Sequence, residues 1–225
     1  MIILALAGKP NAGKSTFFRA ATMSDVEIAD YPFTTIEPNR GVAYVRTECP
    51  CVEMNTICGN SHCQNGKRYI PIELIDVAGL VPGAHQGRGL GNKFLDDLMN
   101  ADAIINIIDI SGRTNEEGEI VESGKYDPLH ESEFIREEID LWLAGVIKRN
   151  WLSVERLARG PNFNMEKSIA SVLSGLGIKS RDILACLRKM EYPPMPSEWE
   201  NLDYERLACL LRGMSKPSMV IANKI

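Results

Sequence analysis

The sequence lacks a long hydrophobic run, an excess of basic residues and a secretory leader. No apolar stretch approaches the roughly 18 residues that a membrane-spanning helix needs, so a membrane protein is not expected. The 25 Lys and Arg are outnumbered by 30 Asp and Glu, so no overall positive field attracts nucleic acid. The opening MIILALAG has no basic leader or cleavage-like end, which predicts a cytoplasmic protein.

The chain is also poor in turn-rich or repetitive stretches, and its 225 residues fit one large domain or a domain with an insertion. Short apolar runs that favour strands alternate with segments of helical spacing, which predicts an α/β fold with a mostly parallel sheet. Strands are expected at residues 2–7, 41–46, 68–79, 101–111 and 218–223, and helices at 14–22 and 90–101.

The second half follows a different pattern. Residues 113–125 are acidic and aperiodic, and we interpret them as a loop. Asp127 then provides an N-cap before Pro128, and the apolar residues that follow keep helical spacing. Further helices are predicted at 165–173, 181–190 and 203–212, with Gly175, Gly177 and Gly213 as stops. The region 128–215 is therefore predicted to be an all-helical insertion.

The strongest motif is GKPNAGKST, from Gly8 to Thr16, between a predicted strand and a predicted helix. It matches the phosphate-binding loop G-x-x-x-x-G-K-[ST], in which backbone N–H groups and the helix N-terminus face the phosphates. The Lys neutralises the β and γ oxygens and the Ser hydroxyl binds Mg²⁺. The predicted nucleotide contacts are Asn11, Ala12, Gly13, Lys14, Ser15 and Thr16.

Two further segments are predicted to sense the γ-phosphate. Asp76 ends an apolar strand and can join the Mg²⁺ shell, while Gly79, three residues on, lets a backbone N–H approach the phosphate. The glycine-rich residues that follow allow two conformations. In DYPFTTIEPNRG, Thr35 is favoured over Thr34 as a further Mg²⁺ ligand when the γ-phosphate is present.

The closing NKI follows an apolar strand and suits a guanine-reading loop. Asn223 would brace the loop and touch the purine, and the stem of Lys224 would cover the base. The Asp that pairs with guanine would come next, beyond Ile225, so the chain is expected to be truncated there. On these two residues alone, an incidental polar end to a strand is the simpler interpretation.

Together GKPNAGKSTFF, YPFTTIEPNRG, DVAGLVPGAHQGRGLGNKFLDDL and ANK resemble the Obg-related GTPases, in their YchF-like branch of archaeal and fungal members. The resemblance implies a P-loop G domain at 1–127 and 216–225, with a Cys-rich hairpin loop at 47–67 and the helical arm at 128–215. It also implies a C-terminal TGS domain, absent here. The implied cofactors are GTP or GDP and Mg²⁺, and the implied partner is the ribosome or a ribosomal RNA-protein complex.

Hydrolysis is expected to be slow, because Leu80 stands where many GTPases carry the Gln that orients the attacking water. Asn11 resembles the residue that helps to hold K⁺ in related GTPases, where the cation mimics an arginine finger. His85 in the switch loop is a second catalytic candidate beside Lys14, Thr35 and Gly79.

Four of the six cysteines, Cys49, Cys51, Cys58 and Cys63, gather in one predicted hairpin loop. Four thiols in a loop too small for its own core suit tetrahedral Zn²⁺, although C-x-C…C-x4-C departs from the usual knuckle spacing. Reduced, unliganded cysteines remain an alternative, as does a disulfide in a hyperthermophile. Cys186 and Cys209 lie on predicted helical faces and are expected in the core.

Three functions are consistent with these residues. The first is a GTPase that acts as a nucleotide-gated switch, with an ATP-preferring YchF-like ATPase as the alternative, because several YchF proteins change the base-reading loop. The second is a binding module whose arm and Cys loop dock on a large partner, with little turnover. The third, a small-molecule phosphotransferase, is disfavoured by the switch-like segments.

Overall fold

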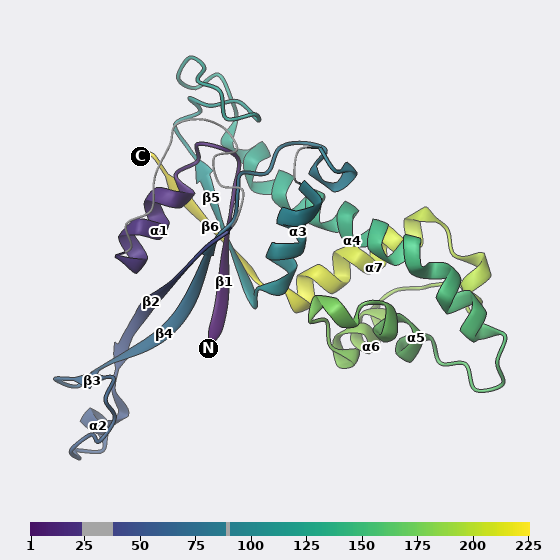
Figure 1. The fold of residues 1–225 in the computed structure, drawn as a ribbon, viewed down its shortest axis with the longest axis horizontal. Helices are drawn as coiled ribbons and strands as arrows, with labels where there is room; N and C mark the ends of the chain where they lie inside the picture. The colour runs from purple at the N-terminus through teal and green to yellow at the C-terminus, as the bar shows by residue number, and fades with distance from the viewer. Residues whose placement is uncertain (24–37, 89–90) are drawn as a thin grey trace.

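A computed structural model describes residues 1–23, 38–88 and 91–225. Within these ranges one mixed sheet, flanked by helices, forms the body of the molecule (Figure 1). The strands are β1 (Ile2–Ala7), β2 (Asn39–Glu48), β3 (Cys63–Gln64), β4 (Lys67–Asp76), β5 (Ala103–Asp109) and β6 (Ser218–Asn223). The predicted α/β fold is confirmed.

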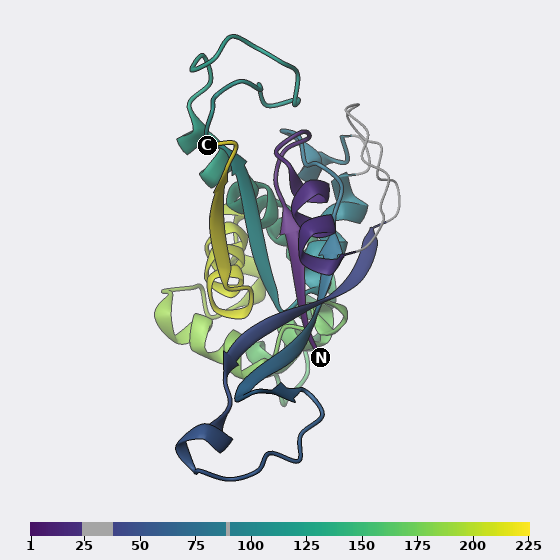
Figure 2. The ribbon, with the colours of Figure 1, turned by 90° about the vertical axis from the view of Figure 1, so that its left-hand side faces the viewer.

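The strand order is β2-β4-β1-β5-β6, with β3 paired to β4 outside this path. β1 lies parallel to both β4 and β5, and β6 lies parallel to β5, whereas β2 and β4 form an antiparallel hairpin. The carboxyl ends of β1, β5 and β6 therefore meet at one end of the sheet, and the hairpin tip projects from the opposite end (Figure 2). Ligands of open α/β sheets bind at that carboxyl end.

The helices of the described residues lie on both faces of the sheet and in an arm to one side (Figure 1). They are α1 (Lys14–Thr22), α2 (Pro50–Glu53), α3 (Gly91–Asn100), α4 (Pro128–Ala158), α5 (Met165–Val172), α6 (Ser180–Lys189) and α7 (Asn201–Ser215), with the short 3₁₀ turns η1 (Ala84–Gln86), η2 (Ser174–Leu176) and η3 (Pro196–Glu198). The predicted helix bounds agree within a few residues.

Alternation along the strands supplies two cores. In β1, Leu6 packs with Phe18 of α1 on one face, while Ala5 and Ala7 join the larger core on the other face. This larger core continues without a break from the sheet through α3 and α4 into the arm. Successive side chains of a strand point to opposite faces, so a strand buried on both faces is apolar throughout.

The long helix α4 joins the sheet to the arm. Asp127 caps it by accepting a hydrogen bond from Leu129 N, as predicted. Near its far end, Trp151 packs on Trp199 with ring centroids 4.4 Å apart. Arg212 of α7 makes a bidentate ion pair with Asp140 of α4, which holds the two helices in register.

Three sequence predictions are wrong. Gly213 does not end α7, which runs on to Ser215 because buried Leu207 and Leu211 hold it by tertiary packing. Cys209 is exposed, since it lies off the buried stripe of α7. β6, predicted as a central strand, lies at the edge of the sheet among the described residues, and Met219 is 57% exposed.

None of the helices that the structure describes is both long enough and apolar enough to cross a membrane.

Candidate functional site

The loop between β1 and α1 adopts a conformation that depends on glycine. Gly13 has φ of 100°, and a Cβ there would lie 2.2 Å from the Asn223 amide nitrogen. Gly8 has φ of 148°, and a Cβ would lie 2.4 Å from the carbonyl oxygen of Ile107. Both positions therefore exclude a side chain. The loop is wrapped closely enough for its backbone N–H groups to face a phosphate.

Lys14 is the buried cation of this loop. Its Nζ donates a 2.8 Å hydrogen bond to the carbonyl oxygen of Lys9, which holds the ammonium across the loop. Burial lowers the pKa of Lys14 to about 8, against the opposing effects of Asp76 and Glu131. A phosphate at the loop would supply the negative charge that this buried ammonium needs.

The predicted Mg²⁺ ligands from β4 and α1 meet. Ser15 Oγ donates to Asp76 Oδ2 over 2.6 Å, although 61 residues separate them in the chain. Asp76 Oδ1 is buried and has no hydrogen-bond partner among the described residues. Burial raises the pKa of Asp76, and Ser15 and Lys14 oppose that rise. A hydroxyl and a carboxylate with an unused oxygen fit the oxygen preference of Mg²⁺.

The segment after β4 lies directly on the phosphate loop. A Cβ at Gly79 would come within 2.5 Å of Pro10 N, so only glycine permits this approach. Leu80 N donates to Gly8 O over 3.1 Å, while the Leu80 side chain is buried in the larger core. The predicted sensor glycine is thus next to the phosphate loop. The neighbouring Leu80 is directed away from solvent.

The segment after β6 also meets the phosphate loop. Asn223 Nδ2 donates to Ala12 O over 2.8 Å, which braces the two loops as the sequence predicted. Lys224 Nζ pairs with Asp109 Oδ2 at 3.0 Å. An open cavity of about 820 Å³ lies beside Lys224 and is lined in part by Ser111 and Thr114. That volume suits a small-molecule ligand.

Asp109 is a site residue that the sequence analysis missed. Its fully buried carboxylate accepts from Ser111, from Thr114 and from Lys224. Burial by itself raises its pKa, but these hydrogen bonds hold the pKa at about 2. Asp109 therefore orders the loop after β5 and the Lys224 side chain together. Its sequence signal was an acid at the carboxyl end of an apolar strand.

Comparison with known proteins agrees with this arrangement. The family model described as 50S ribosome-binding GTPase matches residues 3–138, which is more than half of the chain. The chain belongs to the P-loop GTPases.

Curated relatives place the GTPase in the YchF-like branch. A GTP-binding protein of Methanocaldococcus jannaschii is 48% identical over 226 residues, covering 100% of this chain and 56% of the relative. The protein named ribosome-binding ATPase YchF of Escherichia coli O157:H7 is 32% identical over 225 residues, covering 97% of this chain and 55% of the relative. The GTPase chain thus spans about half the length of the curated relatives it matches.

A solved structure gives the same result. The GTP-binding protein from Pyrococcus horikoshii OT3 superimposes with a TM-score of 0.79 at 32% identity, covering 100% of this GTPase chain and 56% of that chain. The predicted recognition and fold class are therefore confirmed.

Two carboxylates of α4, also missed from the sequence, connect the arm of the GTPase to these loops. Glu131 Oε2 lies 2.8 Å from Lys9 Nζ with both side chains 1% exposed, and Glu131 Oε1 accepts from Asp109 N. Glu138 accepts from the backbone N–H groups of Gly83 and His85 and pairs with His85 Nδ1, each at 2.8 Å. Acids inside the apolar stripe of α4 were the available signal.

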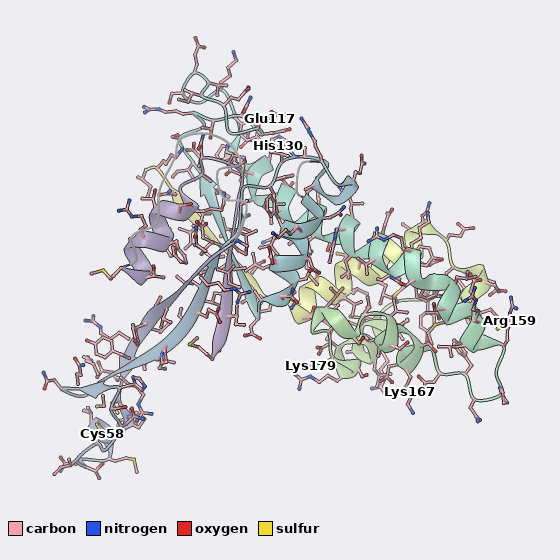
Figure 3. The ribbon with its side chains drawn as sticks, viewed as in Figure 1. Cys58, Glu117, His130, Arg159, Lys167 and Lys179 are labelled. Carbon is pink, nitrogen blue, oxygen red and sulfur yellow. The ribbon has the colours of Figure 1, made fainter. Side chains whose placement is uncertain are left out.

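The remaining predicted residues are distributed as follows. His85 is held by Glu138 and lies in η1, and Asn11 Nδ2 donates to Gly118 O of the acidic loop. Thr16 begins α1 together with Lys14 and Ser15. The predictions for Thr34 and Thr35 fall outside the described residues. The four clustered cysteines lie at the hairpin tip, away from this site (Figure 3).

Burial of Leu80 leads to a testable expectation. We expect Leu80→Gln to leave GTP turnover unchanged, because the new amide enters the core rather than the phosphate site. The free energy of unfolding should fall by about 2–3 kcal/mol, since the buried amide lacks partners. Phosphate release and thermal melting measure the two effects. Leu80→Met, which conserves volume, should preserve both, and faster turnover in Leu80→Gln would contradict the expectation.

Proposed function

We propose that this GTPase binds Mg²⁺–GTP at the loop around Lys14 and hydrolyses it slowly to GDP and phosphate. The supporting observation is the convergence of Lys14, Ser15 and Asp76 beside the Asn223–Lys224 segment. The phosphate loop would hold the β and γ phosphates, and Ser15, Asp76 and Thr35 would hold the Mg²⁺. The metal neutralises the charge that develops on the phosphates.

The residues of this chain supply positioning more than proton transfer. Gly79 N–H would approach the γ-phosphate, and Lys14 would neutralise it. Leu80 offers no hydrogen bond to the attacking water, so turnover is slow. We propose His85 or a K⁺ ion beside Asn11 as the accelerating group. Because Asn11 Nδ2 is donated to Gly118, its Oδ1 is the atom that faces a cation.

Nucleotide state would be transmitted through α4. Glu138 holds the backbone after Gly79, and Glu131 holds Lys9 of the phosphate loop. A γ-phosphate that attracts Gly79 would therefore bias the position of α4 and of the arm. We propose that residues 1–127 and 216–225 form the G domain and that 128–215 form the arm that it moves.

Guanine preference rests on Asn223 and Lys224, and ATP is the second candidate because the YchF relatives are named ATPases. Those names also support the ribosome as the partner of the whole protein, in the cytoplasm. A nucleotide-gated ribosome-binding module with little turnover is the alternative.

The deciding experiment measures phosphate release by the full-length protein from GTP and from ATP, with Mg²⁺ and with either K⁺ or Na⁺. The proposal expects turnover of GTP that requires Mg²⁺ and is lost in Asp76→Ala. Preferential turnover of ATP would favour the second candidate. Tight GTP binding without phosphate release above that of buffer would favour the binding module. Dependence on an added acceptor would indicate a phosphotransferase.

Nucleotide affinity should fall as pH rises through about 8. Without a phosphate nearby the pKa of Lys14 is about 8, lowered by burial. A bound triphosphate stabilises the ammonium and raises this pKa, so binding takes up a proton above pH 8 and becomes weaker. We expect GTP affinity about tenfold lower at pH 9 than at pH 7.

Isothermal titration in two buffers of different ionisation enthalpy measures the affinity and the proton uptake together. In Lys14→Arg the guanidinium stays protonated throughout this range. Whatever its affinity, that variant should show no dependence on pH from this residue. Equal wild-type affinities at pH 7 and pH 9 would contradict the assignment.

A further inference from the structure

The four clustered cysteines form one compact group of sulfur atoms at the hairpin tip. The Sγ atoms of Cys49, Cys51, Cys58 and Cys63 all lie within 4.8 Å of one another. They come from separate positions: the N-cap of α2, the interior of α2, the following loop and the first residue of β3. Folding therefore gathers four ligand-forming side chains that could each have pointed into solvent.

The spacing of the sulfurs is that of a tetrahedral metal site. A Zn–S bond of about 2.3 Å implies sulfurs about 3.8 Å apart along each tetrahedral edge. The Cys49–Cys58 and Cys51–Cys63 sulfurs are 3.6 and 3.8 Å apart. A disulfide instead needs about 2.05 Å. The mutual closeness of all four sulfurs favours one shared centre over two independent pairs.

The tip has almost no core to hold it together. Between residues 49 and 66, Cys49 is the only buried residue, and Val52, Met54 and Ile57 are all exposed. The chain nevertheless turns tightly here, with positive φ at Asn55 and at Gly66. Segments too small to bury apolar surface are commonly ordered by a structural metal. The tip has the geometry of an ordered segment and lacks the apolar packing that would produce it.

Arg68 provides an independent electrostatic observation. It lies on β4 opposite Cys63, and its Nη2 is 3.4 Å from Cys49 Sγ and 3.9 Å from Cys58 Sγ. Four thiolates around Zn²⁺ carry a net charge of −2, which a guanidinium N–H donor offsets. Neutral thiols are weak acceptors and would give this cation little reason to point at two sulfurs.

We propose that Cys49, Cys51, Cys58 and Cys63 bind one Zn²⁺ ion and that Arg68 hydrogen-bonds to two of the thiolates. Four protein ligands leave no open coordination position, so the centre is structural. It lies at the end of the sheet opposite the nucleotide loops, where Figure 3 shows Cys58 on the projecting tip. The site is therefore independent of the proposed GTPase chemistry.

Metal content of the purified protein tests the proposal. After loading with Zn²⁺ and removal of free metal, we expect one equivalent by elemental mass spectrometry. Cys51→Ser and Cys63→Ser should lose it. Cys209→Ser, which removes an exposed thiol on α7, is the matched control and should retain it. Wild type with no zinc, or with the same zinc content as Cys51→Ser, would overturn the proposal.

Cobalt substitution tests the ligand set without relying on the Ser variants to fold. Co²⁺-loaded wild type should show the intense visible bands of a tetrahedral thiolate site and a sulfur-to-metal charge-transfer band. Cys63→His should still bind one Co²⁺, with its bands shifted as one thiolate is replaced by imidazole. Octahedral Co²⁺ spectra, or four cysteines found as two disulfides in protein isolated without reductant, would rule the site out.

Chelation should also change the tip alone. Removal of zinc is expected to speed proteolytic cleavage between residues 49 and 66 and to leave GTP affinity unchanged, because the two regions lie at opposite ends of the sheet. Cleavage at an unchanged rate would contradict a structural role for the metal.

Discussion

Lys14→Ala is expected to weaken GTP binding by at least about 100-fold, because two charged hydrogen bonds worth roughly 1.5–3 kcal/mol each are lost. The Lys14 ammonium is already buried in the phosphate loop and is held across it by Lys9 O. Removing the ammonium leaves the β and γ oxygens facing backbone N–H groups alone. Fluorescent-nucleotide titration measures the dissociation constant, and phosphate release should fall below detection.

Stability measurements separate this loss from unfolding. Since burial lowers the pKa of Lys14, the charged side chain is unfavourable in the nucleotide-free fold. The melting temperature of Lys14→Ala without nucleotide should therefore not fall, whereas GTP should no longer raise it. Lys179→Ala, at an exposed position in the arm (Figure 3), is the control and should bind like wild type. Wild-type affinity in Lys14→Ala would exclude the proposed phosphate site.

Glu131→Gln is expected to lower the free energy of unfolding by about 3–5 kcal/mol, the usual cost of leaving one member of a buried pair unpaired. Gln can still accept the hydrogen bond from Asp109 N, so the substitution removes charge and little else. The Lys9 ammonium would keep Thr114 O and the Tyr126 ring, but no counter-charge. Chemical denaturation of the nucleotide-free chain measures the change.

A double variant tests whether the pair itself is responsible. Lys9→Met should be destabilised to a similar degree, because Glu131 then keeps a buried charge without its ammonium. Lys9→Met with Glu131→Gln removes both charges, and most of the lost stability should return. If the two losses simply add, Lys9 and Glu131 are not energetically coupled, and the proposed link from the phosphate loop to α4 would fail.

Predictions from local sequence agreed closely with the structure where the chemistry is local. The phosphate loop was evident from residues 8–16, because its function depends on glycines, a lysine and a serine in fixed order. The N-cap at Asp127 involves only residues adjacent in the chain. Gly213 was misjudged because helix propensity is weak, and the packing of Leu211 outweighs it.

The contacts that link the site to the arm were not predictable in this way. Lys9 and Glu131 are 122 positions apart in number, and either would be read from sequence as an ordinary surface charge. Asp109 was hidden at the end of an apolar strand, and its partners Thr114 and Lys224 come from different loops. Only the folded chain shows which buried charges face one another.

The sequence by itself therefore determined the parallel α/β fold, the phosphate loop and the elements that flank it, since strand alternation, helical spacing and loop motifs are properties of neighbouring residues. The tertiary structure decided which carboxylates of α4 reach the nucleotide loops and how the four cysteine sulfurs converge. These depend on strand order and on the packing of α4 against β5, which bring distant residues within a few ångströms.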